Sequence, residues 1–218
     1  MKYLGWFSCG VTSAVACKMA IDKYGKNVDL WYIDTGASHP DNIRFIEDCE
    51  KWYNKKISIA RSNMFSSPLD VASKKIFNTP YGAPCTLELK KKVRSEIEKK
   101  YQNFCHVFGF EYLAKEINRA NRWVEQQKQI AYFPLIEEKL NKEDCKLILL
   151  NNGIILPKMY ELGYNNNNCI GCFKGGIKYW LKIKKDFPDV FQKTAELERL
   201  KHSTCLKRNG KRLYLDEL

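Results

Sequence analysis

Three short apolar segments near the start of the chain alternate with two segments of helical spacing, and this alternation constrains the fold more than any other feature. Residues 3–7, 28–33 and 56–60 are rich in aromatic and β-branched or aliphatic side chains, as strands are. Residues 14–20 and 39–53 have the spacing of helices. The order predicts a parallel sheet with right-handed crossovers, in which ligands bind beyond the carboxyl ends of the strands.

The alternation continues to about residue 140 of the 218 residues and then stops. Residues 86–101 have the pattern of an amphipathic helix, residues 104–108 predict a fourth strand and residues 131–136 a fifth. Later segments predict helices, and Asn209 with Gly210 predicts a terminal hairpin. We therefore predict a Rossmann-like α/β domain over residues 1–140, with a parallel sheet of about five strands and helices on both faces. A mainly helical region that ends in a β-hairpin is expected over residues 141–218.

Composition and charge narrow the class of protein. Hydrophobic residues make up 44% of the chain, which is enough for a globular core and excludes a disordered protein. The formal net charge of +12 favours anionic partners, which include nucleic acid, acidic membranes and phosphorylated small molecules. Much of this charge is diffuse. The lysines at residues 90–92, 99–100 and 182–185 fall on predicted helices, where a solvated helix face is the alternative to nucleic-acid contact.

Nine cysteines raise the question of the redox compartment. The count is odd, the first residues do not form a secretory leader, and no apolar run is long enough to span a membrane. We therefore expect a cytoplasmic protein without a membrane partner, whose cysteines are free, buried or bound to metal.

A polar loop, residues 8–13, joins the first predicted strand to the first predicted helix. Gly10 has no Cβ, so the backbone there can come close to a ligand. Ser8, Thr12 and Ser13 supply hydroxyl groups that can donate hydrogen bonds to phosphate oxygens, and the free N–H groups at the helix start point toward the same anion. The loop predicts a phosphate site, with a plain N-cap as the alternative.

A second loop, residues 34–36, follows the second predicted strand and offers an acidic acceptor and a tight turn. Because parallel strands end at one edge of a sheet, we expect the two loops to lie side by side in one crevice. An N-capping role is the alternative for Asp34 alone, whereas the two loops together predict a nucleotide site. The predicted nucleotide-binding residues of these loops are Ser8, Cys9, Gly10, Val11, Thr12, Ser13, Asp34, Thr35 and Gly36.

The end of the fourth predicted strand brings further polar residues to the same rim. Gly109 and Glu111 follow the strand directly, and Glu116 and Arg119 lie on the polar helix after it. We add these four residues to the predicted nucleotide site.

Cys169 and Cys172 form a C-x-x-C pair between two helical segments. A metal site, a redox dithiol and chance are the three interpretations of such a lone pair. Cys85 follows Pro84 at a helix start, where the helix dipole favours a thiolate, and three thiolates can hold an iron–sulfur cluster with one open iron. Cys105, Cys145 and Cys205 are the candidates for a fourth ligand, and each is alternatively a buried small hydrophobe.

In this order, the motifs resemble the phosphoadenylyl-sulfate (PAPS) reductase-like family of the adenine-nucleotide α-hydrolase-like superfamily, which also contains the PP-loop ATP pyrophosphatases. The similarity covers about residues 1–200 and rests most on the two N-terminal loops. It also includes Pro40, residues 134–135 and the L-P-x-x-Y-x-x-G pattern of residues 156–163.

The resemblance implies roles for the motif residues. Residues 8–13 would hold the terminal phosphate or sulfate of an adenine nucleotide, residues 34–36 would lie near the adenylyl group, and Arg119 would bind an anion. The resemblance further implies that Cys85, Cys169 and Cys172 are ligands of a [4Fe-4S] cluster, with zinc or no metal as the alternatives.

The chain departs from the family pattern at three places. Cluster-bearing members have two adjacent cysteines where this chain has Cys85 and Thr86, and ATP-cleaving relatives have an aspartate where it has Thr12. Sulfonucleotide reductases use a C-terminal nucleophilic cysteine followed by Gly and His. Cys205 is the candidate for this catalytic residue, and it lacks that continuation.

Three functions follow from the resemblance. An enzyme that reduces an adenylyl sulfate with a thioredoxin-like thiol partner is the favoured hypothesis, with Cys205 as the nucleophile. An ATP-dependent or cluster-dependent sulfurtransferase that modifies nucleic acid is the first alternative. A nucleotide-binding module without catalysis is the second.

Overall fold

A computed structural model describes residues 1–79 and 82–218 of the chain, and these residues form two compact units. The first, which we call the sheet unit, comprises Met1–Ile33, His39–Ala60 and Glu98–Asn167. The second, which we call the cysteine unit, comprises Asp34–Ser38, Arg61–Ile97 and Asn168–Leu218. The units are interleaved along the chain, and the boundary predicted at residue 140 lies inside the sheet unit.

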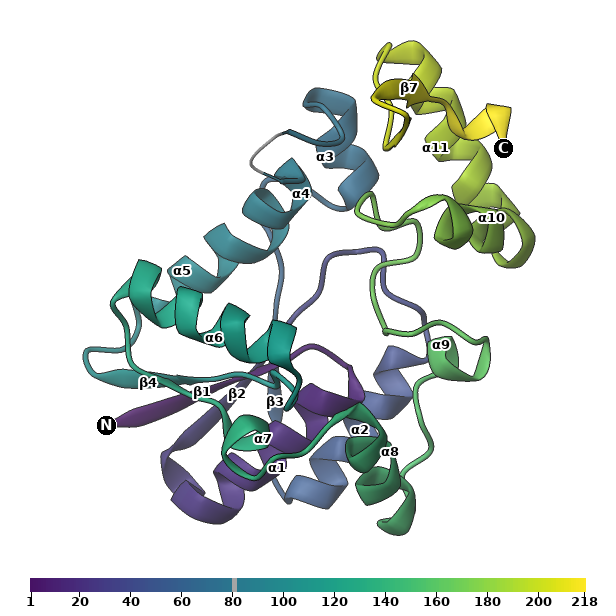
Figure 1. The fold of residues 1–218 in the computed structure, drawn as a ribbon. Helices are drawn as coiled ribbons and strands as arrows, with labels where there is room; N and C mark the ends of the chain where they lie inside the picture. Colours follow the sequence, from purple (N-terminus) through teal and green to yellow (C-terminus); the bar gives the residue numbers. More distant parts are fainter. Residues whose placement is uncertain (80–81) are drawn as a thin grey trace. The chain divides into compact units, whose positions relative to one another are not determined.

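The sheet unit is built on a five-stranded parallel sheet with the order β3-β2-β1-β4-β5 (Figure 1). The fold class predicted from the sequence is confirmed. The strands are β1 (Lys2–Phe7), β2 (Val28–Ile33), β3 (Ile57–Ala60), β4 (Phe104–Val107) and β5 (Ala131–Tyr132). The last strand is shorter than the predicted residues 131–136 because Pro134 opens a helix, where its missing N–H costs nothing.

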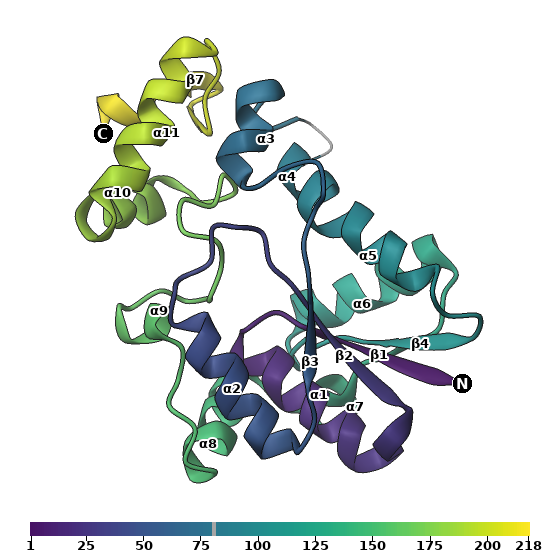
Figure 2. The ribbon, with the colours of Figure 1, turned by 180° about the vertical axis from the view of Figure 1, so that it is seen from behind.

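Helices cover both faces of this sheet, as Figures 1 and 2 show from opposite sides. One face carries α1 (Val11–Tyr24), α2 (Asn42–Tyr53), α7 (Pro134–Glu137) and α8 (Lys142–Asn151), and the other carries α6 (Ala114–Gln127). Phe7 stacks on Phe45 of α2 at 5.9 Å between ring centroids, whereas His106 of β4 meets Trp123 of α6 at 5.0 Å. The 3-10 turn Gly25–Asn27 and α9 (Lys158–Glu161) complete the unit.

The cysteine unit is mainly helical. It contains α3 (Pro68–Lys74), α4 (Pro84–Thr86), a π-helical turn (Leu87–Lys91), α5 (Lys92–Glu98), α10 (Ile177–Asp186) and α11 (Pro188–Leu200). The last residue of α5, Glu98, belongs to the sheet unit. The predicted hairpin is confirmed as β6 (Leu206–Arg208) and β7 (Lys211–Leu213), and a 3-10 turn (Leu215–Glu217) follows it. No helix in the described part of the chain has the length and apolar character needed to cross a membrane.

Glu198 of α11 fastens the terminal hairpin. Its side chain is fully buried and accepts hydrogen bonds from the backbone N–H of Cys205 at 2.5 Å and of Leu215 at 2.7 Å. Each of these donors flanks the hairpin, so one carboxyl group fixes both of its ends to α11.

A second buried carboxylate of this unit, Glu88, gives a pH-dependent prediction. Glu88 is 3% exposed and forms ion pairs with Lys75 and, at 2.8 Å, with Lys92, and the hydrogen bonds from these lysines lower its pKa. A lowered pKa means that the stabilisation is present above the ordinary glutamate value and is lost as the pH falls through the folded-state pKa. We expect Glu88→Gln to lower the free energy of unfolding at neutral pH by about 2 kcal/mol.

Urea titrations of both proteins at about pH 7 and about pH 4 check this prediction. The difference between wild type and variant should shrink in acid. An unchanged difference at the lower pH would contradict the role of the carboxylate charge.

Candidate functional site

The strand order locates a topological switch point between β1 and β4. From β1 the chain proceeds to β2 and β3 on one side, and from β4 it proceeds to β5 on the other. Ligands of doubly wound sheets bind beyond the carboxyl ends of the strands at such a point. Gly109, just after β4, lies against the first turn of α1, because a Cβ on it would stand 2.6 Å from the backbone nitrogen of Ser13. The loops after β1 and β4 therefore lie side by side.

The loop of residues 8–13 is closed by the hydroxyl group of Ser13. This buried group donates to the carbonyl oxygen of Gly10 at 2.9 Å, accepts from the backbone N–H of Ser8 at 3.0 Å and lies 3.0 Å from the Ser8 hydroxyl. Cys9 is buried and has a φ of +57°, which lets the chain turn sharply into α1. Ser13 thus shapes the loop, whereas Ser8 is exposed and Thr12 half-buried.

The start of α1 adds a favourable field for an anion. No acidic side chain lies in the first turn of this helix, and no side chain caps it at Gly10. The partial positive charge at the helix N-terminus is therefore not neutralised locally. A hydroxyl-bearing loop with this field has the chemistry of a phosphate or sulfate site.

Two residues from far along the chain support this loop, and neither of them is among the predicted site residues. The Tyr160 hydroxyl accepts a hydrogen bond from the backbone N–H of Val11 at 3.4 Å. The Asn167 side-chain amide donates to the carbonyl oxygen of Cys9 and to the side-chain oxygen of Asn42, both at 2.7 Å. The pattern of residues 156–163 was the available signal, but nothing local in it indicates a contact with residue 11.

The remaining predicted residues of the sheet unit have partners close to the loop after β4. Glu111 accepts from the backbone N–H of Lys142 at 2.9 Å and so holds the start of α8. Glu116 and Arg119 form an ion pair at 3.1 Å, and the Arg119 guanidinium lies 4.4 Å from the Phe110 ring centroid. Nucleotide contact by these residues stays a prediction.

Residues 34–36 belong to the cysteine unit, although they follow β2 directly. Asp34 accepts from the backbone N–H of Gly36 at 2.9 Å and pairs with Arg61 at 2.5 Å. The Thr35 hydroxyl is buried and lies 2.9 Å from the sulfur of Cys169. Contact of this loop with the adenylyl group stays a prediction, whereas its contact with a cysteine was not expected from the sequence.

The nine cysteines are sorted between the two units. Cys9, Cys17, Cys49, Cys105 and Cys145 are buried in the sheet unit, and Cys85, Cys169, Cys172 and Cys205 are half-buried in the cysteine unit. No disulfide joins any of these nine cysteines, all of which lie among the described residues. Of the three candidates for a fourth ligand, only Cys205 therefore shares a unit with the C-x-x-C pair.

The four cysteines of the cysteine unit influence one another. Burial raises the pKa of the Cys85 thiol, and nearby Cys169 and Cys172 raise it further. Burial and then the Glu198 carboxylate raise the pKa of the Cys205 thiol, with smaller contributions from Cys172 and Cys85. The Asn78 side chain links the segment that follows Cys172 to the segment that contains Cys205. It donates hydrogen bonds to the carbonyl oxygens of Phe173 at 3.0 Å and Cys205 at 3.3 Å.

Thiols are the donor type that iron–sulfur clusters and zinc require, so the chemistry of this group fits either. Within residues 1–79 and 82–218, however, no group of three or more cysteine, histidine or carboxylate side chains is arranged so that it could hold a metal ion.

The sorting of the cysteines predicts their reactivity. We expect an alkylating reagent to label only cysteines of the cysteine unit in the folded protein, because a thiol must be accessible to react. All nine should be labelled after denaturation. Mass spectrometry of the digested protein locates the labels, and early labelling of Cys17 or Cys49 would contradict the prediction.

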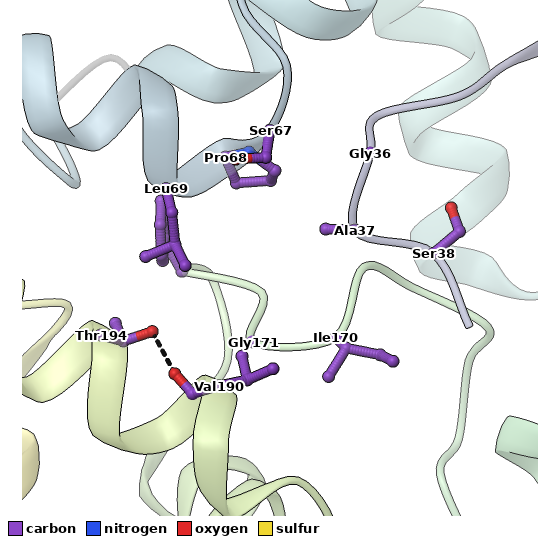
Figure 3. A pocket seen from close by; sticks show the side chains of 11 residues that line it. Gly36, Ala37, Ser38, Ser67, Pro68, Leu69, Ile170, Gly171, Val190 and Thr194 are labelled. Carbon is purple, nitrogen blue, oxygen red and sulfur yellow. Dashed lines mark hydrogen bonds between the residues drawn. The ribbon is translucent and has the colours of Figure 1, made fainter. Parts of the chain in front are cut away.

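A cavity of about 300 Å³ lies within the cysteine unit beside the C-x-x-C loop (Figure 3). Ile170 and Gly171, which separate the two cysteines, line it together with Ala37 and Leu69. The backbone N–H of Ile170 donates to the carbonyl oxygen of Ala37 at 2.7 Å and thereby fixes one wall. The small and aliphatic lining suits a compact apolar group.

A doubly wound parallel sheet with a hydroxyl-bearing loop at its switch point defines an α/β protein of the class whose ligands bind beyond the carboxyl ends of the strands. The chain belongs to the phosphoadenosine phosphosulfate reductase domain family, whose model matches residues 3–175. The resemblance inferred from the motifs is thereby confirmed.

Two curated relatives come from Methanocaldococcus jannaschii. The uncharacterized protein MJ0066 is 26% identical over 205 residues, which cover 88% of this chain and 40% of that protein. The uncharacterized protein MJ0973 is 24% identical over 197 residues, which cover 88% of this chain and 46% of that protein. The chain thus spans less than half the length of these relatives.

Two solved structures share the fold. The phosphoadenylyl-sulfate reductase of Candida auris in its phosphate complex superposes with a TM-score of 0.56 and 17% identity, covering 78% of this chain and 81% of that one. The U34-tRNA thiolase NcsA of Methanococcus maripaludis with its [4Fe-4S] cluster superposes with a TM-score of 0.50 and 17% identity, covering 92% of this chain and 72% of that one.

Proposed function

We propose that this protein binds an adenine nucleotide at the loop of residues 8–13 and reduces an adenylyl sulfate with thiols. The observation that supports the proposal is the hydroxyl-bearing loop at the uncapped start of α1, at the switch point of the sheet, in a chain of the phosphoadenosine phosphosulfate reductase domain family. Thr12 stands where ATP-cleaving relatives have a carboxylate, so the loop suits a phosphate or sulfate better than a magnesium ion.

The reaction requires two thiols. A cysteine thiolate attacks the sulfur of the adenylyl sulfate, the bond from sulfur to the phosphate oxygen breaks, and the nucleotide leaves with the electron pair. A second thiol, from a thioredoxin-like partner, then attacks the cysteine sulfur of the S-sulfo intermediate and releases sulfite as a disulfide forms. The two thiols supply the two electrons that reduce the sulfur.

Cys205 is the candidate for the first thiol. Because burial and Glu198 raise its pKa, the thiolate fraction is small at neutral pH and grows as the pH rises. We therefore expect sulfite release to be faster at about pH 9 than at about pH 7.

The test is sulfite release from adenosine 5′-phosphosulfate or its 3′-phosphate in the presence of thioredoxin. Cys205→Ser should abolish release, whereas Cys49→Ser, which changes a buried cysteine of the sheet unit, should retain it. If neither substrate yields sulfite, the proposal is refuted. If Cys205→Ser still releases sulfite, Cys205 is not the nucleophile.

A second candidate function is sulfur transfer to nucleic acid with the help of an iron–sulfur cluster. The gathering of Cys85, Cys169, Cys172 and Cys205 in one unit supports it, as do the net charge of +12 and the fold shared with a tRNA thiolase. Three of these thiols, those of Cys85, Cys169 and Cys172, would hold the cluster, which would then supply one open iron atom able to carry sulfide.

Two measurements separate this candidate from reduction. Iron, sulfide and zinc analysis after anaerobic purification should find about four irons and four sulfides per chain if a cluster is present. Pyrophosphate release from ATP should increase when RNA or DNA is added. Protein without iron or sulfide that leaves ATP intact in both conditions would exclude the candidate.

A further inference from the structure

The hydroxyl group of Tyr160 lies beside the loop of residues 8–13. Its oxygen accepts from the backbone N–H of Val11 at 3.4 Å. Within the described part of the chain, no acceptor takes the hydroxyl proton. Burial raises the pKa of Tyr160, so the group is a protonated donor at neutral pH.

Three hydroxyl groups surround one small space above Gly10. A Cβ on Gly10 would stand 3.6 Å from the Tyr160 oxygen, 3.6 Å from the Ser8 oxygen and 3.9 Å from the Ser13 oxygen. The absent side chain of Gly10 leaves this space open, beside the N-terminus of α1. An oxygen atom of an anion placed near it would come within reach of donors from two segments about 150 residues apart.

The chain also holds Tyr160 in place there. Asn167 donates to the carbonyl oxygen of Cys9, so residues on both sides of α9's C-terminus contact the loop. Lys146 of α8 lies 5.6 Å from the Tyr160 ring centroid and adds positive charge nearby. The ring is therefore fixed by its surroundings rather than swinging into the site.

We propose that Tyr160 is an anion-binding residue that donates its hydroxyl proton to the terminal phosphate or sulfate held by residues 8–13. The inference rests on the proposed nucleotide site and names a donor that the N-terminal loop does not contain. A hydrogen bond from a neutral hydroxyl to a charged oxygen contributes more than one between neutral groups. Tyr160 thereby distinguishes nucleotides from nucleosides.

Calorimetric titration with adenosine 5′-phosphosulfate, AMP and adenosine tests the assignment. In Tyr160→Phe we expect the dissociation constants for the two anions to rise about tenfold or more, with that for adenosine unchanged. A merely structural role would weaken all three ligands alike. Tyr164→Phe, at a buried tyrosine four residues further along, is the matched control and should bind like wild type.

Gly10→Ala is a second variant that does not depend on the stability of Tyr160→Phe. Gly10 has φ −96° and ψ 153°, which alanine adopts without strain, and the added methyl group would make ordinary contacts. This variant should fold normally yet lose affinity for both anions, because the methyl group fills the space between the hydroxyls.

The outcomes are distinct. If wild type binds none of the three ligands, the proposed function fails and this inference fails with it. If wild type binds the anions and Tyr160→Phe binds them equally well, or loses adenosine to the same degree, only the role of Tyr160 is refuted.

Discussion

Replacing Gly36 with alanine is expected to unfold the cysteine unit. Gly36 has a φ of +71°, and a Cβ on it would stand 1.9 Å from the carbonyl oxygen and 3.0 Å from the carbonyl carbon of Ser66. Both atoms belong to the backbone, so no side-chain rotation can relieve the overlap. We expect a loss of at least about 3 kcal/mol in the free energy of unfolding.

Hydrogen exchange monitored by mass spectrometry checks this result, because it reports on each segment separately. Protection should fall in α3, α10 and α11 of the cysteine unit. Gly153→Ala is the control: Gly153 has nearly the same φ, +72°, but nothing lies within 4 Å of the added Cβ. It should cost only the backbone term of about 1 kcal/mol. Equal losses in the two variants would show that the contact with Ser66 is unimportant.

Replacing Gly109 with alanine should disable the proposed nucleotide site from the other side of the switch point. The added Cβ would stand 2.6 Å from the nitrogen and 2.7 Å from the Cα of Ser13, and 2.7 Å from the carbonyl carbon of Thr12. The first turn of α1 must then move, which misplaces the N–H groups that would face the anion of the proposed ligand. We expect a loss of about 100-fold or more in affinity for AMP, since several hydrogen bonds are displaced together.

Calorimetric titration measures this loss, and thermal unfolding measures the accompanying destabilisation. Gly176→Ala is a suitable control because nothing lies within 4 Å of its added Cβ and its φ is negative. A Gly109→Ala protein that binds AMP like wild type would show that the α1 terminus does not contact the nucleotide.

The elements of the sheet unit could be predicted from the sequence because they follow from local periodicity. Residues 28–33 are apolar and β-prone, and they form β2 within the predicted bounds. The length of β5 was overestimated, because residues 131–136 are apolar almost throughout and apolar character alone does not show that a helix begins at Pro134. The predicted helix over residues 86–101 contains a π-helical turn at Leu87–Lys91, which side-chain spacing alone does not reveal.

The candidate site was predictable only in its first loop. Ser8, Gly10 and Ser13 are close in sequence, so their composition already indicates an anion-binding turn. Tyr160 and Asn167 reach the same loop from about 150 residues away, and no local pattern encodes that distance. The hydrogen bond between the Thr35 hydroxyl and Cys169 is hidden for the same reason.

By itself, then, the sequence determined the parallel α/β class and the family, and it predicted a phosphate site in the loop of residues 8–13, because periodicity, side-chain type and motif order are properties of the chain. The tertiary structure alone decided that five cysteines are buried in one unit and four lie in the other, and that the Tyr160 hydroxyl contacts the backbone of Val11. These contacts depend on how segments cross in space, where burial and hydrogen-bond geometry select partners regardless of their separation along the chain.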